Sequence, residues 1–384
     1  MATRAPGARL PLLAVEGTHA TLGQAMGRSS AVHIRAAVEQ ALATLHEQGI
    51  DDATLNEQIA PFVEAAERIF PQYLVELRAM ADAAGVPFPV LFRLNCYESR
   101  PPGTPPAAAP AAPSVPVKDP GVLPRAGNGA APAGAPDALV PTGIDGCTSV
   151  VSAGRHGIVA GHTEDSYPSA ADGLYLLDAT VTERNPVNGA PRHRFLALNY
   201  AQTLPGCAAA VNEYGLVVLI DALPDPERRV GAPRHFLSRA LLDAPSIDAA
   251  LDLLHQTQRA GGWNFLLVQG TRAVNAETTA TRVAVTEIAG GAYAHTNHFL
   301  DSALAAQAIE PRENSLKRLA RALELARPGM TVAEMKALLS DRHGFPDSIC
   351  RERTIGAFVV DTAARQIEVC WGEPHAATWT SYAY

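Results

Sequence analysis

The sequence has no long run of apolar residues. The run near its beginning, residues 10–15, is interrupted by Pro11 and is too short for the hydrophobic core of a signal peptide. No other stretch approaches the ~18 apolar residues that a membrane-spanning helix needs. We therefore expect a cytoplasmic protein without a membrane partner.

Cysteine is scarce as well. The chain has five Cys residues, an odd number, and no two of them form a Cys-x-x-Cys pair. This pattern argues against a disulfide framework or a structural zinc site, and it is typical of buried thiols in a reducing compartment. We expect packing roles for four of them: Cys96, Cys207, Cys350 and Cys370.

Positive charge is limited, since the formal net charge is −8 at pH 7 and only three residues are lysines. Such a chain is not expected to bind nucleic acid or an anionic membrane. The motifs Gly-x-Gly-x-x-Gly after a strand, the P-loop and Gly-x-Ser-x-Gly are also missing, which removes support for dinucleotide, nucleotide and α/β-hydrolase chemistry. What remains is a chain of 384 residues with 47% hydrophobic content, enough for a large core.

Residues 1–100 have a mostly helical pattern. Apolar residues at three-and-four spacing predict helices over 31–45, 59–69 and 74–84, after a short strand at 12–15. Gly85 follows the last of these helices and is a typical helix stop.

Residues 101–141 differ in composition from the rest of the chain. They hold 12 of the 30 prolines, with alanine and glycine between them. Such a segment cannot recover its ordering entropy through burial, so we expect it to be extended or disordered. It is either an inert insertion or a tether that lets two chain ends separate after a break downstream.

The chain beyond residue 146 is rich in strand patterns. Residues 147–153 and 158–161 predict a hairpin that turns at 154–157. Further strands are predicted at 174–182, 194–199, 208–211, 216–221, 265–269, 282–288, 293–295, 355–360 and 367–371, and helices at 234–242, 246–256, 315–325 and 332–339. This order predicts an α+β fold in which two stacked, mostly antiparallel sheets lie between helical layers, a four-layer αββα sandwich.

The Gly146–Cys147 bond stands at the start of the first of these strands. A bare Gly-Cys pair is usually a buried cysteine that opens a core strand. If this bond is cleaved, however, Cys147 gains a free α-amine with an ordinary pKa of ~7.7–8.0, which can serve as base for its own thiol. Glycine before the cysteine tolerates the unusual backbone angles that attack on its carbonyl requires.

Asp165 lies on the second strand of the predicted hairpin. A turn at 154–157 would bring residues 161–165 close to Cys147. A carboxylate there can hold the α-ammonium or orient the lone pair of the amine. The competing interpretation is an ordinary polar residue near a turn.

The stretch 145–148, Asp-Gly-Cys-Thr, together with Asp165 resembles the self-cleaving N-terminal-nucleophile hydrolases, in particular the isopenicillin-N acyltransferase-like family. Bile-salt hydrolases and penicillin V acylases are more distant relatives. Further matching pieces, in the same order, are 16–19, 94–98, 212–216, 234–249, 295–299 and 371–372. The resemblance implies residues 1–146 as a helical pro-segment that becomes the small fragment, with the linker 101–141, and residues 147–384 as the catalytic large fragment.

The resemblance also implies roles for single residues. Cys147 would be the nucleophile, released by cleavage after Gly146. Asp165 would position its amine, and Asn297 would bind the amine or a developing oxyanion. Arg318 falls where the family has an active-site arginine, although a solvated helix face is an equally good interpretation of that position.

Four positions are candidates for substrate contacts, and all depart from the family or match it loosely: His162, Thr163, Asp221 and Ser315. His162 and Thr163 stand where relatives have arginine and asparagine. Asp221 stands where the bile-salt branch has an oxyanion-hole asparagine, so a backbone N–H with Asn297 would have to serve. An oxyanion-hole donor contributes about 2.7–4 kcal/mol of transition-state stabilisation.

The function expected from these residues is hydrolysis of a linear amide of a small N-acyl or N-aminoacyl amine through an acyl-enzyme. The alternative within the family is N-acyl transfer with a coenzyme A thioester as acyl donor; no cofactor is expected otherwise. Both fragments would stay associated, and a homo-oligomer is compatible with the sequence. A non-catalytic αββα scaffold whose Pro-rich segment binds a partner is the alternative from another class.

A metal site is not expected. His295 and His298 are three residues apart, but a third ligand at matching spacing is missing.

Overall fold

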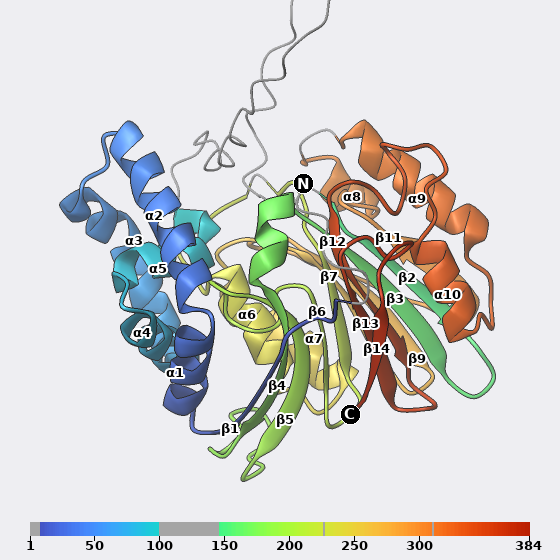
Figure 1. The fold of residues 1–384 in the computed structure, drawn as a ribbon, viewed down its shortest axis with the longest axis horizontal. Coiled ribbons are helices and arrows are strands. Elements are labelled where there is room, and N and C mark those ends of the chain that lie inside the picture. Colours follow the sequence, from blue (N-terminus) through green and yellow to red (C-terminus); the bar gives the residue numbers. More distant parts are fainter. Residues whose placement is uncertain (1–7, 100–145, 226, 309–310) are drawn as a thin grey trace, which may run out of the picture.

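The computed structural model describes residues 8–99, 146–225, 227–308 and 311–384, which form four layers (Figure 1). Two sheets stack face to face in the middle, and helices cover the outer face of each. The predicted α+β fold of αββα type is therefore confirmed. The prediction for residues 101–141 lies outside the described residues.

The larger sheet has eight strands in the order β1-β4-β5-β6-β7-β8-β9-β10. Its strands are β1 (Leu12–Gly17), β4 (Leu174–Val181), β5 (His193–Tyr200), β6 (Ala209–Asn212), β7 (Val217–Asp221), β8 (Asn264–Gln269), β9 (Arg272–Thr278) and β10 (Val283–Glu287). All neighbours are antiparallel except β1 and β4, which run parallel. Strand β1 comes from the N-terminal segment, so that segment is part of the sheet itself.

The smaller sheet has six strands in the order β11-β2-β3-β12-β13-β14, all antiparallel. Its strands are β2 (Thr148–Ala153), β3 (Ile158–Asp165), β11 (Ala292–His295), β12 (Thr354–Asp361), β13 (Gln366–Trp371) and β14 (Trp379–Ala383). Strands β2 and β3 form the predicted hairpin, with Ala153 opposite Ile158 at its turn.

Helices on the side of the larger sheet come mostly from the N-terminal segment. They are α1 (His19–Ser29), α2 (Ala31–Glu47), α3 (Asp52–Ile69), α4 (Pro71–Ala84) and α5 (Phe88–Asn95), followed by α6 (Arg234–Leu241) and α7 (Ile247–Gln256). Gly85 ends α4 in a left-handed conformation with φ of 68°, as the sequence predicts. Ser246 caps α7 by accepting a hydrogen bond from the amide of Ala249.

Helices α8 (Ser302–Ala305), α9 (Glu313–Leu325) and α10 (Val332–Leu339) cover the smaller sheet. Met335 and Leu339 of α10 lie over Gly161 of β3, where a Cβ atom would come within 2.8 Å of Met335 Sδ. Helix α9 packs against β2 and β11. Strands β2 and β11 thus lie against α9 and β3 lies against α10, while β2 and β3 face β7 and β8 of the larger sheet on the other side.

The sequence did not predict α5, β9 and β14. Helix α5 is only eight residues long and begins beside two prolines. Strand β9 reads Arg-Ala-Val-Asn-Ala-Glu-Thr, and its asparagine and glutamate are nevertheless buried. Polar residues in a buried strand break the alternation on which sequence prediction depends.

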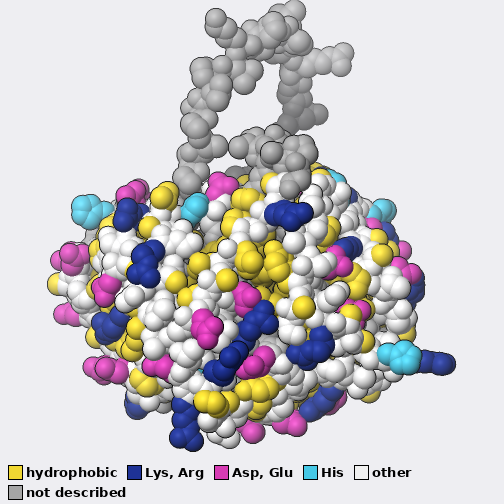
Figure 2. Space-filling view, turned by 60° about the horizontal axis from the view of Figure 1, so that its bottom comes forward, with side chains coloured by type: hydrophobic (Ala, Val, Ile, Leu, Met, Phe, Trp, Pro, Cys, Tyr) yellow, Lys and Arg dark blue, Asp and Glu magenta, His cyan; other side chains and the backbone are white. Residues whose placement is uncertain are grey.

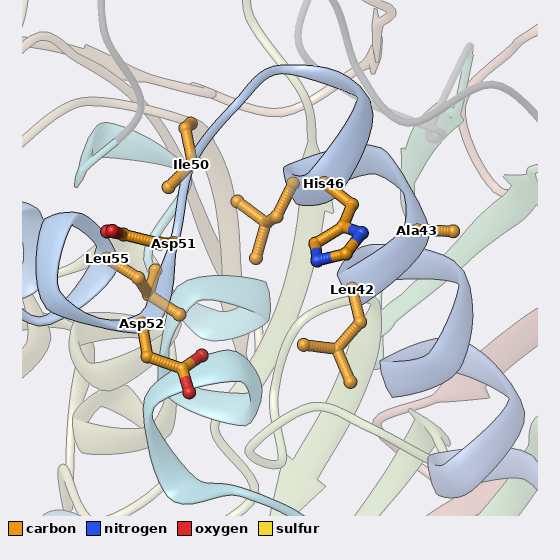
Figure 3. A pocket seen from close by; sticks show the side chains of 8 residues that line it. Leu42, Ala43, His46, Ile50, Asp51, Asp52 and Leu55 are labelled. Atoms are coloured by element: carbon orange, nitrogen blue, oxygen red, sulfur yellow. The ribbon is translucent and has the colours of Figure 1, made fainter.

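The outer surface of the described residues has a pocket, and neither sign of charge dominates the face shown in Figure 2. A hollow of about 440 Å³ lies between the end of α2 and the start of α3, lined by residues that include Leu42, His46, Asp52 and Leu55 (Figure 3). On the face shown in Figure 2, basic and acidic side chains are interspersed. None of the helices in the described ranges is long and apolar enough to cross a membrane.

Candidate active site

The hairpin of β2 and β3 sets which side chains face the space between the sheets. Ser149 pairs directly with His162, and Thr148 pairs with Thr163. Side chains alternate between the two faces of a strand. Ser149, His162 and Glu164 therefore point toward the larger sheet, whereas Thr148 and Thr163 point toward α9 and α10.

The thiol of Cys147 lies on the side of Glu164. Cys147 is 1% exposed, and its Sγ donates a hydrogen bond to Oε2 of Glu164 over 3.7 Å. Burial raises the pKa of the thiol well above its ordinary value, and the charges of Glu164, Asp221 and Asp165 raise it further. Because the thiolate is the nucleophilic form, this thiol needs a base.

The amide nitrogen of Cys147 contacts Asn297, the residue to which the family resemblance gives the free amine or a developing oxyanion as partner. It donates to Oδ1 of Asn297 over 2.9 Å. Asn297 follows β11, whose pairing with β2 places it beside the start of that strand. Its Nδ2 donates to the carbonyl oxygen of Ala222 over 3.0 Å, so the donor that was expected to serve an oxyanion is engaged there.

The side chain of Arg318, on α9, contacts both Asn297 and Cys147. Its Nη2 donates to Oδ1 of Asn297 over 2.7 Å, and its Nη1 donates to the hydroxyl of Thr148 and to the carbonyl oxygen of Cys147. Arg318 is fully buried, which excludes a solvated helix face. Burial and the neighbouring Arg351 lower the pKa of Arg318 to about 10, so the guanidinium stays cationic at neutral pH.

Ser315 lies one helical turn before Arg318 and does not contact Cys147. Its hydroxyl accepts a hydrogen bond from the amide of Asn297 over 2.9 Å and lies 2.8 Å from Nδ1 of His298. Burial, His295 and Arg318 lower the pKa of His298 to about 4, so this ring is neutral at pH 7. Ser315 thus fixes the loop that carries Asn297.

Gly146 lies against two cationic side chains. A Cβ atom at this position would come within 2.3 Å of Nη2 of Arg351 and 2.8 Å of Nη2 of Arg318. A larger residue would displace both guanidinium groups. The need for glycine therefore comes from this close approach, which leaves two cations beside the Cα atom of Gly146.

The side chain of Asp165 lies on the opposite face of β3 from that of Glu164. Its Oδ2 accepts from Nε of Arg351 over 2.7 Å, and its Oδ1 accepts from the hydroxyl of Thr354 over 2.6 Å. The charge of Asp165 contributes to the raised pKa of the Cys147 thiol. Asp165 is thus close to Cys147, as predicted, but the structure ties its carboxylate to Arg351; its role toward the amine stays a prediction.

His162 and Asp221 belong to a chain of buried hydrogen bonds between the sheets. His162 Nε2 lies 2.9 Å from Oε2 of Glu164, and Nδ1 lies 2.9 Å from the hydroxyl of Ser149. Ser149 donates to Oδ1 of Asp221 over 3.0 Å. On the far side of Asp221, His295 lies between Oδ2 of that residue and Glu277, at 3.2 and 2.9 Å.

The two histidines of this chain carry raised pKa values. Burial lowers the pKa of His295, but its hydrogen bonds to Asp221 and Glu277 outweigh burial and raise it to about 9. Burial likewise lowers the pKa of His162, and Glu164 with Asp221 and Asp165 raises it overall. The fourth candidate for substrate contact, Thr163, faces the helices, and its hydroxyl has no hydrogen-bond partner among the described residues.

The sequence alone did not point to Glu164, Ser149, Tyr200 or Arg351 as site residues. Tyr200, at the end of β5, donates to Oε1 of Glu164 over 2.6 Å. The alternation along the hairpin contains a usable signal for Glu164, because it lies two residues from His162 and on the side of Ser149. Tyr200 comes from the other sheet, and no local pattern links it to the hairpin.

Comparison with protein families identifies the class. A model of the family named acyl-coenzyme A:6-aminopenicillanic acid acyl-transferase matches residues 152–376, more than half of the chain. The class that this match defines is that of acyl-transferases. The chain belongs to the acyl-coenzyme A:6-aminopenicillanic acid acyl-transferase family, which confirms the resemblance; the match begins downstream of Cys147.

Two individual proteins are also similar. A β-alanyl-dopamine/carcinine hydrolase from Drosophila melanogaster is 28% identical over 254 residues, which cover 64% of this chain and 57% of that protein. The aligned part thus spans little more than half of the relative's length. A variant of conjugated bile acid hydrolase from Clostridium perfringens aligns with 62% of this chain and 97% of its own, at 10% identity and a TM-score of 0.35.

Proposed function

We propose that this chain is a self-processing cysteine amidohydrolase that cleaves its own Gly146–Cys147 bond. The thiol of Cys147 adds to the carbonyl carbon of Gly146, the C–N bond breaks, and the nitrogen of Cys147 leaves as an amine. Water then hydrolyses the thioester, giving a carboxylate on Gly146 and a free thiol. The observation that carries this proposal is the placement of a buried thiol beside a carboxylate, next to a glycine flanked by two guanidinium groups.

In the processed enzyme the α-amine of Cys147 would take the thiol proton, and the sulfur would attack a linear amide. The nitrogen is the atom that Oδ1 of Asn297 already accepts from, so Asn297 would orient its lone pair. The cations Arg318 and Arg351 are suited to stabilise the developing oxyanion. Water would then release the acyl group from the thioester.

The substrate we propose is an amide of a small N-acyl or N-aminoacyl amine. The name of the Drosophila relative, which denotes hydrolysis of β-alanyl amines, favours this class. The family name favours a second candidate, transfer of an acyl group from a coenzyme A thioester to an amine. The two differ only in whether water or an amine attacks the acyl-enzyme.

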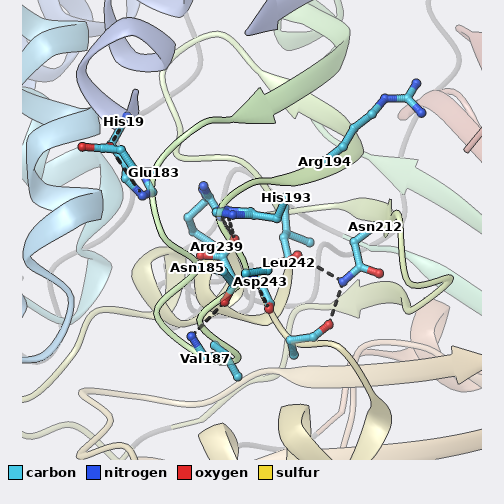
Figure 4. A network of polar contacts seen from close by, with 12 residues as sticks. His19, Glu183, Asn185, Val187, His193, Arg194, Asn212, Arg239, Leu242 and Asp243 are labelled. Atoms are coloured by element: carbon cyan, nitrogen blue, oxygen red, sulfur yellow. Dashed lines mark hydrogen bonds and ion pairs between the residues drawn. The ribbon is translucent and has the colours of Figure 1, made fainter. Parts of the chain in front are cut away.

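The fragments 1–146 and 147–384 would remain associated after cleavage. Strand β1 pairs with β4 across this division, and Tyr73 donates to Oδ2 of Asp243 over 2.6 Å. Arg239 lies between Glu76 and Asp243, 2.8 and 2.7 Å from their carboxylates, with all three side chains fully buried. The surrounding polar network, which includes His19, is drawn in Figure 4.

The five cysteines are all unpaired and buried, which supports a reducing compartment such as the cytoplasm. Fractionation of the source cells tests this assignment.

Self-cleavage is tested on the purified full-length chain. We expect two bands on a denaturing gel in place of one at 40.4 kDa, and an N-terminal sequence Cys-Thr-Ser for the larger fragment. Cys147→Ala should stay intact. An intact wild-type chain that still hydrolyses amides would refute the processing step, and an intact chain inert to thiol reagents would favour the scaffold interpretation.

The reaction is tested with a panel of N-acyl amines, β-alanyl amines, and acyl-coenzyme A with an amine. We expect amine release from the amides without coenzyme A. Product formation only in the presence of the thioester would assign the chain to acyl transfer instead.

A further inference from the structure

The uncleaved chain lacks the base that the processed enzyme would use. Before cleavage the nitrogen of Cys147 is an amide, which is not basic and donates its hydrogen to Asn297. Burial nevertheless raises the pKa of the thiol. Self-cleavage therefore needs a proton acceptor other than the α-amine.

Glu164 occupies the position of such an acceptor. The side-chain hydrogen bond of the Cys147 thiol goes to Oε2 of Glu164. The other two carboxylates near the thiol are engaged elsewhere, Asp165 by Arg351 and Thr354, and Asp221 by Ser149, Asn264 and His295. Glu164 itself is 1% exposed and is oriented by Tyr200, whose hydroxyl donates to Oε1, and by His162 at Oε2.

The hydrogen-bond chain defines how protons are distributed around Glu164. The one hydroxyl hydrogen of Ser149 goes to Asp221, so Ser149 accepts from Nδ1–H of His162. The tautomer of His162 is assigned from this network. Nε2 of His162 and Oε2 of Glu164 then share a single proton, so the pair is either imidazolium with carboxylate or imidazole with carboxylic acid.

We propose that Glu164 is the general base of self-cleavage, with His162 and Tyr200 as positioning residues, and that the α-amine replaces it only in turnover. The proton passes from Sγ of Cys147 to Oε2 of Glu164 while the sulfur adds to the Gly146 carbonyl. Glu164 returns this proton to the departing nitrogen as the C–N bond breaks. This inference rests on the proposed function.

The test uses full-length chain freshly made in a cell-free translation system. Synthesis is stopped, the chain is transferred to buffers of different pH, and its conversion to the two fragments is measured over time. Glu164→Gln keeps the shape but removes the base, and we expect its processing rate to fall by ~10²-fold or more. Glu164→Asp should retain part of the rate. Glu277→Gln is the matched control, because Glu277 is an equally buried carboxylate. Among the described residues its hydrogen-bond path to Glu164 runs through His295, Asp221, Ser149 and His162. We expect this variant to slow processing less than about tenfold.

The pH profile separates a base from a merely structural residue. The titratable groups that face Glu164 are Cys147, His162 and Tyr200, with Cys207 and Asp221 behind them. Without the Glu164 base, thiolate must form by loss of its proton to hydroxide, so the rate for Glu164→Gln should rise about tenfold per pH unit. The wild-type rate should change less than about threefold between about pH 6 and 8.

Each outcome decides one question. Processing of Glu164→Gln at the wild-type rate, or slow processing with the wild-type pH profile, would overturn the role of Glu164 and leave self-cleavage intact. A wild-type chain that is never processed would refute the proposed function itself. Folding is checked by comparing the melting temperature of Cys147→Ala with that of Cys147→Ala carrying Glu164→Gln, since neither can be processed.

Discussion

Asn297 contacts both the nitrogen of Cys147 and Arg318 of α9. It is the residue through which the structure links a loop after β11 to the start of β2. Its side chain uses its oxygen for Cys147 and Arg318 and its nitrogen for Ala222. In the processed enzyme that we propose, removing it would leave the α-amine of Cys147 without an acceptor to orient its lone pair.

Asn297→Ala is therefore expected to lower kcat of the processed enzyme by ~10²-fold, the size of effect seen when a polar group is removed from an oxyanion-type site. Steady-state amide hydrolysis at saturating substrate measures it. Asn314→Ala is the control, because Asn314 also contacts Nη2 of Arg318, at 3.3 Å, but lies on α9 and does not hold the nitrogen of Cys147. An equal loss in both variants would assign the effect to Arg318.

Gly146→Ala tests the close approach of the two guanidinium groups. The added methyl would displace Arg351 and Arg318, the cations proposed to stabilise the oxyanion at the Gly146 carbonyl, so processing should slow by at least ~tenfold. Gly270→Ala is the control for alanine at a positive φ, since Gly270 has a φ of 59° but a Cβ there meets nothing within 4 Å. Normal processing of Gly146→Ala would show that the cations are not needed at this position.

Among the secondary-structure elements, the N-terminal segment is joined to the rest through β1, α4 and α6. Arg239 of α6 is fully buried between Glu76 of α4 and Asp243. Such an ion pair contributes little net stability over an apolar replacement, but removing one partner leaves charges uncompensated.

Arg239→Ala should destabilise the protein by about 3–5 kcal/mol and lower the urea concentration at which the fragments separate. Arg272→Ala is matched to it, since Arg272 also contacts two carboxylates, Asp248 and Glu287, but its side chain is 41% exposed. That variant should lose no more than about 1 kcal/mol. Urea unfolding of both variants gives the comparison, and similar midpoints would contradict the importance of the buried interface.

At the scale of the whole molecule, the stack of two sheets buries a charged network in its middle. His295 bridges Asp221 of β7 and Glu277 of β9 across the sheets, and its pKa is raised from an ordinary 6.5 to about 9. A histidine that binds its proton more tightly when folded stabilises the fold as long as the proton is present. This contribution is complete below pH 6.5 and is lost as the pH rises through about 9.

The melting temperature of uncleaved Cys147→Ala should therefore fall between pH 6.5 and 9. In Cys147→Ala carrying His295→Gln, which has no titrating ring at this position, the fall should be smaller. Differential scanning calorimetry in buffers of equal ionic strength measures both. Parallel curves for the two proteins would show that His295 does not titrate in this range.

Several parts of the fold followed from local patterns alone. Helix α10 runs over residues 332–339, as predicted, and the hairpin turns at 154–157 with strands in the expected register. These elements have regular apolar spacing bounded by turn residues, which is the signal that sequence periodicity reports best. Strand β9 lacked that signal because its buried face carries Asn275 and Glu277.

Only part of the candidate site could be predicted from the sequence. Short-range spacing placed Gly146, Cys147 and Asp165 together, and the family resemblance added Asn297 and Arg318. The sequence could not show that Asp165 pairs with Arg351, which is distant in the chain. Nor could it show that Glu164 lies next to the thiol of Cys147. Those contacts depend on which face of β3 each side chain takes and on what the facing layer supplies.

The sequence by itself determined the layered fold class, the Gly-Cys junction and the acidic, cysteine-poor character of this protein, because these depend on composition, spacing and periodicity along the chain. The tertiary structure alone decided which carboxylate meets the thiol. Tyr200 and Asp221 lie on the larger sheet and His162 and Ser149 on the smaller one, so only the stacking of the two sheets brings their hydrogen bonds together. Burial between those sheets then sets their charge states, since a low-dielectric interior strengthens every interaction between the groups that it encloses.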